Sequence, residues 1–142
     1  MISVYKGVAH PWQCDFLGHL TTRFYTALFD DASYHFIYQL FGWTGSSDDE
    51  GKLGWVDVRH VTNYQAEVAA GGLLEIEASI IKIGGKSITY YYEMKNLGSG
   101  EVAATLESVC VLFDLEERNA VAVPAELREQ AEKYLQPAIE GD

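Results

Sequence analysis

A single aspartate, Asp15, lies in the segment CDFLGHLTTRF, just before a stretch that is patterned as a long helix. A carboxylate can attack a carbonyl carbon directly, or it can take a proton from a water molecule that attacks. An aspartate that caps a helix normally lies immediately before the first turn, whereas Gly18 separates Asp15 from this helix. Asp15 is therefore either directed at something other than the first helical amides or an ordinary turn residue.

The other chemically active side chains form no recognisable ligand set. Asp31 and His35 have i,i+4 helical spacing but supply only two ligands. Cys14 and Cys110 are far apart and match no metal or redox spacing, so we expect free thiols in a reducing compartment. The sequence predicts no metal site, because no short ligand motif contains any of the four histidines: His10, His19, His35 and His60. No other cofactor is expected.

The stretch after Asp15 is predicted to be one long amphipathic helix that begins near Thr22. Thr21 or Thr22 can cap its first amides through the side-chain hydroxyl, and Gly42 is expected to end it in the left-handed conformation. Apolar residues recur every three or four positions and give the helix an aromatic face: Tyr25, Leu28, Phe29, Ala32, Phe36 and Leu40.

Strands dominate the rest of the chain. A short edge strand is expected over residues 4–9, and longer strands over residues 55–68, 73–83, 86–97 and 101–114. In LLEIEASIIKI, apolar and polar residues alternate, which indicates a strand with one buried face. The Gly84-Gly85 pair predicts a two-residue hairpin turn with positive φ, and a short terminal helix is expected to begin at Pro124.

This order of elements predicts an α+β fold. An antiparallel sheet must cover the apolar stripe of one central helix, so we expect the sheet to wrap around that helix. The length of 142 residues is that of one ordinary domain, residues 1–142. An unpaired edge of such a sheet favours pairing with a second copy of the chain.

Composition and charge narrow the class of function. The chain is 48% hydrophobic, which is enough to build a core. Its formal net charge of -11 opposes non-specific binding to nucleic acid or to an anionic membrane. The start of the chain lacks the pattern of a secretory signal, and no segment approaches the roughly 20 apolar residues of a membrane span. We therefore expect a cytoplasmic protein.

The segment CDFLGHLTTRFYTALFDDAS resembles the signature of the hotdog-fold acyl-CoA thioesterases of the 4-hydroxybenzoyl-CoA thioesterase type. In that signature an Asp is followed by two residues, Gly-His, an apolar residue, often two asparagines, and a helix with an early aromatic residue. Thr21 and Thr22 stand where the asparagines often occur. KIGGKSITYYYEM resembles the family's central hairpin, and VCVLFDLEERNAVAVPAELRE its last strand and terminal helix. The matching signature positions are Asp15, Gly18, His19, Leu20, Phe24 and Tyr25.

The resemblance implies a hotdog fold and a homodimer or homotetramer with active sites between subunits. It implies hydrolysis of an acyl-CoA thioester, with Asp15 as nucleophile or general base and the backbone amide of Thr22 polarising the thioester carbonyl. A helix N-terminus suits that role, because free amides and the helix dipole stabilise the developing negative charge. His19 is interpreted mainly as a hydrogen-bonding residue beside the site, and Gly18 and Tyr25 as substrate-binding residues.

Coenzyme A carries phosphates, so an acidic protein must bind it with local cations. Arg59, Lys82 and Lys86 are candidate substrate-binding residues, with Arg118 as a further cation. Lysines that flank a hairpin turn, however, usually only keep the turn soluble.

Two further groups of residues have alternative interpretations. Some hotdog thioesterases use a carboxylate from the central helix, but Asp30 and Asp31 lie off the apolar stripe and are expected to face solvent or an interface. Aromatic residues can line an acyl pocket or form a cage for a quaternary ammonium group, although ordinary packing explains most of them. They are Trp12, Trp43, Trp55, Tyr90, Tyr91 and Tyr92.

Three functions are compatible with these residues. The first is an acyl-CoA thioesterase that acts on a small or medium acyl group. The second is a hotdog enoyl-CoA hydratase, which would need an Asn-Pro step that the sequence lacks. The third is a non-catalytic module that binds acyl-CoA, or a protein, in the same groove.

Overall fold

The structure is a computed structural model that describes residues 1–136 of the 142-residue chain. The chain begins with strand β1 (Ile2–Val8), a short 3-10 helix η1 (Pro11–Gln13) and the long helix α1 (Thr22–Phe41). The elements that follow are β2 (Leu53–Tyr64), β3 (Leu73–Ile83), β4 (Ser87–Asn96), β5 (Val102–Asp114), β6 (Asn119–Ala120) and α2 (Ala125–Glu132). The predicted α+β fold is confirmed.

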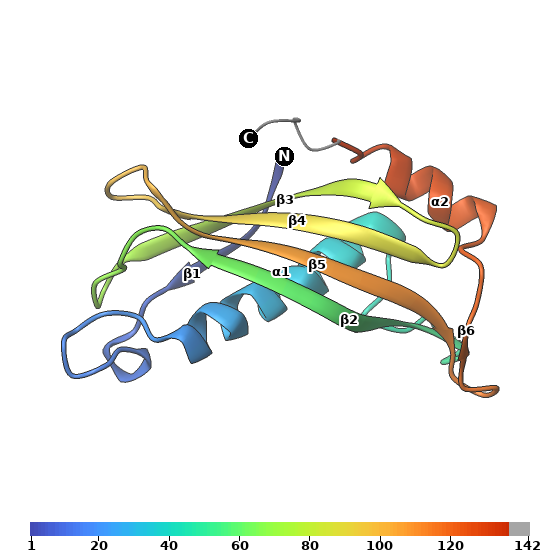
Figure 1. Cartoon of the computed structure of the whole chain (residues 1–142), viewed down its shortest axis with the longest axis horizontal. Helices are drawn as coiled ribbons and strands as arrows, with labels where there is room; N and C mark the ends of the chain where they lie inside the picture. The colour runs from blue at the N-terminus through green and yellow to red at the C-terminus, as the bar shows by residue number, and fades with distance from the viewer. Residues whose placement is uncertain (137–142) are drawn as a thin grey trace.

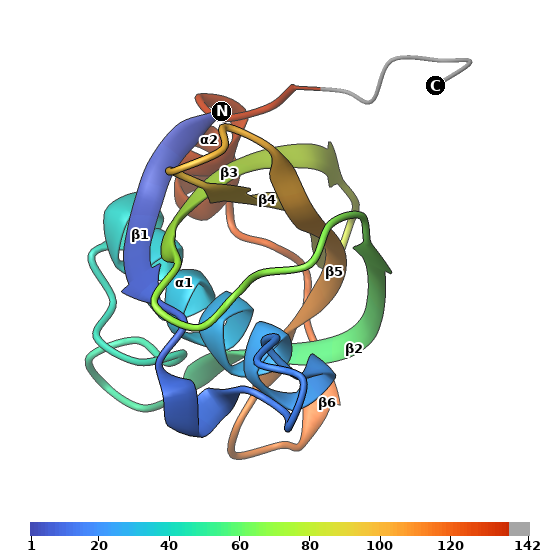
Figure 2. The ribbon, with the colours of Figure 1, turned by 90° about the vertical axis from the view of Figure 1, so that its left-hand side faces the viewer.

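The strands form one antiparallel sheet in the order β1-β3-β4-β5-β2, and the two-residue β6 pairs with β5. Figure 2 looks along the molecule and shows the sheet curving around α1. The terminal helix α2 lies beside the end of β3 (Figure 1). β1 and β2 are the two edges of this sheet, so the predicted edge strand and the predicted wrapping of the sheet are both confirmed.

The alternating pattern of β3 places one face of the sheet against α1. Leu74, Ile76, Ala78 and Ile80 are at most 1% exposed, as their alternation with polar residues predicted. Opposite them on β4, Met94 pairs with Ile76, Tyr92 with Ala78 and Tyr90 with Ile80. These partners are also buried. Because successive side chains of a strand point to opposite faces, the pairing of the two strands builds one continuous apolar layer.

The apolar stripe of α1 packs on that layer. Its buried residues include all six that the periodicity predicted, with Ile37 in addition. Phe36 lies at the centre and makes edge-on contacts with Tyr90, Tyr92 and Tyr134 at ring distances of 5.8, 6.2 and 5.7 Å. Removing such a ring typically costs about 3–5 kcal/mol. Neither helix within residues 1–136 is long and apolar enough to cross a membrane.

The two ends of α1 differ from each other. Gly42 ends the helix with φ 73°, and its N–H donates to the carbonyl of Tyr38 at 2.8 Å, as expected. The predicted hydroxyl cap at the other end is wrong, because no side chain of residues 1–136 caps the first turn. Thr21 instead donates its hydroxyl and its backbone N–H to the carbonyl of Gln13, at 3.3 and 3.2 Å. The first helical amides are therefore left without a side-chain acceptor.

The predicted turn at Gly84-Gly85 is also wrong in detail. A hairpin does join β3 to β4, but neither glycine has a positive φ, and the connection contains residues 84–86. The C-terminal segment fixes this turn, because Val123 N–H donates to the Gly85 carbonyl and Arg128 Nη2 to the Gly84 carbonyl, at 2.9 and 2.8 Å. Contacts from distant residues therefore override the local preference for a two-residue primed turn.

Candidate active site

A tight loop carries Asp15. Cys14 and Leu20 form an isolated antiparallel bridge at its base, and Asp15 N–H donates to the His19 carbonyl at 2.9 Å. Gly18 N–H donates back to the Asp15 carbonyl at 3.0 Å, with Gly18 at φ 82°. That left-handed conformation suits glycine, because other residues are strained there. Gly18 thus shapes the loop through its backbone.

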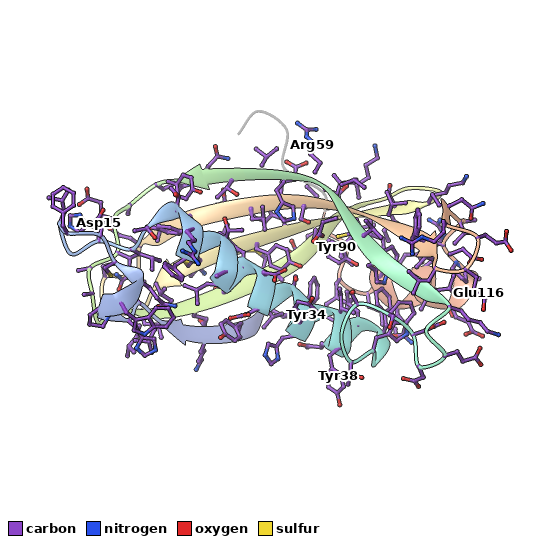
Figure 3. The ribbon with its side chains drawn as sticks, turned by 90° about the horizontal axis from the view of Figure 1, so that it is seen from below. Asp15, Tyr34, Tyr38, Arg59, Tyr90 and Glu116 are labelled. Atoms are coloured by element: carbon purple, nitrogen blue, oxygen red, sulfur yellow. The ribbon has the colours of Figure 1, made fainter. Side chains whose placement is uncertain are left out.

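The carboxylate of Asp15 is held by its own loop. Oδ1 accepts hydrogen bonds from the backbone N–H groups of Leu17 and His19 at 2.9 and 3.2 Å. This is the geometry of an Asx turn, so the interpretation of Asp15 as a turn residue describes part of its role. Within residues 1–136, Oδ2 accepts no hydrogen bond, and the residue is exposed at one end of the molecule (Figure 3). One oxygen fixes the carboxylate and the other is open to solvent.

The first turn of α1 follows this loop. Phe24 and Tyr25 N–H both donate to the Thr21 carbonyl, at 3.0 and 3.2 Å. Thr22 and Arg23 N–H precede them and have no acceptor within the described chain. Free amides at a helix N-terminus carry partial positive charge and attract anions. The Thr22 amide is thus available to polarise a carbonyl.

His19 and Tyr25 are tied to the segment between β2 and β3. His19 Nε2 lies 3.4 Å from Glu67 Oε2, and its backbone bridges to Ala69. Tyr25 is buried and donates its hydroxyl to the Ala66 carbonyl at 3.2 Å. Burial is the main cause that raises the pKa of Tyr25. Both side chains therefore link the Asp15 loop and α1 to the segment between β2 and β3.

The predicted phosphate-binding cations do not gather at this loop in one chain. Arg59 is exposed on edge strand β2 and lies away from Asp15 in Figure 3. Lys82 and Lys86 are exposed at the β3–β4 turn. That turn lies at the opposite end of the long axis from the Asp15 loop (Figure 1).

A second polar site lies between α1 and strands β2, β4 and β5. It is a cavity of about 60 Å³ whose wall includes Asp30 and Tyr34 of α1, Trp55 and Asp57 of β2, and Tyr90 of β4. The pKa of the Asp30 carboxyl is raised, first by burial and then by repulsion from Asp57 and Asp31, with His60 opposing. Two carboxylates thus share one small space.

Asp57 also contacts a thiol and an imidazole. Cys110 Sγ donates to Asp57 Oδ1 at 2.9 Å, and His60 Nε2 lies 3.7 Å from the same oxygen. A cysteine, a histidine and an aspartate in contact suggest a cysteine nucleophile. However, burial, reinforced by Asp57, raises the pKa of the Cys110 thiol far above neutrality. The thiol therefore stays protonated and unreactive. Within residues 1–136, no three or more His, Cys, Asp or Glu side chains are arranged to hold a metal ion.

The sequence alone does not bring these residues together. Asp30 is a candidate there as a helix carboxylate, whereas no motif singles out Asp57. Trp55 and Asp57 are two positions apart in the strand segment GWVDVRH and therefore point to the same face. That spacing was a usable signal, but only the packing of α1 on β2 shows that Asp30 faces the same space.

The family of the chain follows from a match that spans the Asp15 loop, α1 and strands β2 to β6. A family model described as the thioesterase-like superfamily matches residues 9–131. The chain belongs to this superfamily, and its class is that of a thioester hydrolase. No curated protein is similar enough to count as a match.

Solved structures share the fold at low sequence identity. A protein from Pseudomonas aeruginosa strain PAO1 is 24% identical, with 94% of this chain and 92% of that chain covered and a TM-score of 0.81. A Staphylococcus aureus protein in complex with CoA is 18% identical, with 100% of this chain and 92% of that chain covered and a TM-score of 0.82. A 1,4-dihydroxy-2-naphthoyl-CoA thioesterase from Synechocystis is 15% identical, with 94% of this chain and 97% of that chain covered and a TM-score of 0.78. The predicted hotdog fold is confirmed.

Proposed function

We propose that the protein is a cytoplasmic acyl-CoA thioesterase that hydrolyses a small or medium acyl-CoA to the free acid and CoA, with Asp15 as its essential carboxylate. The observation that carries this proposal is the environment of Asp15. Its Oδ1 is fixed by two backbone N–H groups, its Oδ2 is open, and the unused amides of Thr22 and Arg23 begin the helix that follows.

Two reaction routes fit this arrangement. In the first, Asp15 Oδ2 attacks the thioester carbon, the CoA thiolate leaves and takes a proton, and water hydrolyses the mixed anhydride. In the second, Asp15 accepts a proton from a water molecule whose oxygen attacks the same carbon. In both routes the thioester oxygen becomes negative, and the Thr22 amide supports that charge.

A second copy of the chain completes the proposed site. Arg59, Lys82 and Lys86 lie away from Asp15 within one chain, so these three residues would contact the phosphates of a CoA bound near Asp15 from another subunit. Residues 53–55 of the edge strand β2 bond to the loop at residues 46–48, and within residues 1–136 no strand pairs with the outer side of the rest of β2. Val56, Val58 and Tyr64 are exposed along it. Edge strands of this kind pair readily with another chain. We therefore propose a homodimer or homotetramer. The Staphylococcus aureus protein solved with CoA supports coenzyme A as the carrier.

The test is thiol release from a panel of acyl-CoA esters with short, medium, long and aromatic acyl groups. Asp15→Asn keeps an oxygen that can accept from Leu17 and His19 N–H, so the loop is retained while the charge is lost. We expect turnover to fall by about 10²–10⁴-fold. Asp31→Asn is the matched control, because it removes the same charge from the exposed face of α1. An Asp15→Asn enzyme with the wild-type rate would overturn the role of Asp15.

A non-catalytic acyl-CoA-binding module is the second candidate. One observation favours it, because the Asx turn gives Asp15 a structural role that needs no catalysis. This alternative predicts that wild-type protein binds acyl-CoA without releasing thiol from any ester of the panel. Hydrolysis that depends on Asp15 would exclude it.

A further inference from the structure

The cavity beneath α1 contains two buried polar atoms that lack partners. Within residues 1–136, Trp55 Nε1 and Tyr90 Oη are buried and make no hydrogen bond. Trp55 is 6% exposed and Tyr90 1% exposed, and both line the cavity. Figure 3 shows Tyr90 between the helix and the sheet. A buried donor without an acceptor is destabilising, so a group that supplies the acceptor would be bound favourably.

Packing holds both side chains in place. The Trp55 ring stacks on Phe41 at 5.6 Å with an interplanar angle of 20°. The Tyr90 ring stacks on Tyr92 at 6.4 Å and meets Phe36 edge-on. Neither side chain can turn toward solvent without disrupting the core. The two unpartnered atoms therefore belong to rings that are fixed in the cavity wall.

The outer part of the cavity is acidic and aromatic. Asp30 and Asp57 are exposed carboxylates, and Tyr34 beside them is 46% exposed. Among the described residues, the cavity wall includes no lysine or arginine. A carboxylate pair next to aromatic rings attracts a cation and repels an anion. The floor thus offers hydrogen-bond donors, and the rim offers negative charge.

We propose that this cavity binds a small organic amine whose ammonium group faces Asp30 and Asp57 and whose oxygen accepts hydrogen bonds from Trp55 Nε1 and Tyr90 Oη. An amino alcohol or an amino-acyl group has this chemistry. The size agrees, because about 60 Å³ holds about four to six water-sized groups at roughly 10–15 Å³ each. The inference concerns binding and holds whether or not the chain hydrolyses thioesters.

The site is separate from Asp15 within one chain. Asp30 follows Thr22 by eight helical residues, a rise of about 12 Å along α1. A ligand as small as the cavity cannot reach from one site to the other. Loss of thioesterase activity and loss of amine binding can therefore be measured as independent events.

The experiment is a titration of the full-length protein, followed by NMR chemical shifts, with four probes at constant pH and ionic strength. Ethanolamine carries both required groups, ethylammonium lacks the oxygen, ethylene glycol lacks the charge, and acetate has the opposite charge. Four heavy atoms limit the ethanolamine Kd to about 0.05 mM at best, and we expect a value below about 10 mM. Ethylammonium should bind about three- to tenfold more weakly, ethylene glycol at least about tenfold more weakly, and acetate not at all.

Variants assign the binding to the cavity. Asp57→Asn should weaken ethanolamine binding at least about tenfold. Tyr90→Phe removes one hydroxyl with little change of shape, whereas Trp55→Phe removes the indole N–H together with one ring. Each should weaken ethanolamine binding about three- to tenfold. Tyr90→Phe should in addition raise the melting temperature of the free protein, because it removes an unpartnered buried hydroxyl. Asp31→Asn is the control and should bind ethanolamine within about twofold of wild type.

Three results would each overturn the proposal. The first is no ethanolamine binding below about 100 mM. The second is equal binding of all four probes. The third is unchanged ethanolamine binding by folded Asp57→Asn and Tyr90→Phe variants, which would assign the cavity to ordered water.

Discussion

The Asp15 loop and the cavity beneath α1 both present carboxylates, but their surroundings differ in kind. In the loop, the backbone N–H groups of Leu17 and His19, within four residues of Asp15, donate hydrogen bonds to one of its carboxylate oxygens. In the cavity, Asp30 and Asp57 repel each other, and two buried donors have no acceptor in the part of the chain that the structure describes. The first site fixes its carboxylate with local hydrogen bonds and leaves its open groups in contact with solvent, whereas the second buries its unpartnered donors.

This contrast separates two kinds of functional site. A carboxylate held by its own loop is positioned at little cost in stability, which suits a group that must attack or deprotonate in one fixed orientation. Crowded charges and unpartnered donors cost stability, and a ligand of complementary chemistry recovers that cost on binding. The Asp15 loop is thus arranged for reaction and the cavity for recognition.

Removing the charge of Asp15 gives the largest expected effect. Asp15→Asn should lower thiol release by about 10²–10⁴-fold, because the carboxylate acts as nucleophile or base. The same variant should bind ethanolamine within about twofold of wild type, because the cavity lies about 12 Å along the helix. Parallel thiol-release assays and NMR titrations check this. A simultaneous loss of amine binding would show that the two regions act as one site.

Thiol labelling tests how closed the cavity wall is. Cys110 is buried, and its pKa is raised by burial and by Asp57, whereas Cys14 in the loop is partly exposed. A maleimide reagent at neutral pH should label Cys14 at least about tenfold faster than Cys110. Mass spectrometry of the native protein over time gives both rates, and labelling in urea is the control. Equal rates in the native protein would mean that the cavity opens readily.

The loop backbone should tolerate a side chain poorly at Gly18. A Cβ there meets nothing within 4 Å, so Gly18→Ala costs only the strain of φ +82°, about 1–2 kcal/mol. Gly85→Ala is the control, because its Cβ also meets nothing within 4 Å and its φ is not positive. Urea unfolding of both variants gives the two free energies. Equal stabilities would show that the loop can adopt another conformation.

Neutralising Asp30 should give the smallest change. Its folded-state pKa is raised, so its charge destabilises the fold at neutral pH. Asp30→Asn should therefore be more stable than wild type at pH 7, by less than about 1 kcal/mol because the group is largely solvated. This advantage should shrink as the pH falls through the raised pKa and vanish below the ordinary value of 3.8. Urea unfolding across this pH range checks the sign, and a less stable variant at pH 7 would contradict it.

Periodicity predicted the helices and strands that pack one face on the same apolar layer along their whole length. The alternation of β3 gave its bounds, residues 73–83, because every second side chain faces the same helix. The apolar stripe of α1 was predicted for the same reason, since a single apolar layer covers this helix. The end of α1 at Gly42 was predicted too. Asp15 was selected through its resemblance to a signature, and its Asx turn depends on contacts within five residues.

Features that depend on distant partners could not be predicted. Thr21 does not cap α1, because its hydroxyl donates to Gln13, and no propensity encodes that choice. Gly84 and Gly85 adopt a different turn because residues 123 and 128 bind their carbonyls. The cavity requires α1, β2 and β4 to meet, so its residues are scattered through the sequence between Asp30 and Cys110.

The contacts at the end of β3 also set the order in which a newly made chain can finish folding. Ile80 donates its N–H to the Tyr134 carbonyl and accepts from Gln136 N–H, at 3.0 and 2.7 Å. The residues that hold β3 and its turn thus follow all the long strands of the sheet in the sequence. The β3–β4 hairpin can pair with β5 first, and its far end is then fixed when residues 123–136 dock on it. Docking of residues 123–136 is therefore the step that closes this fold.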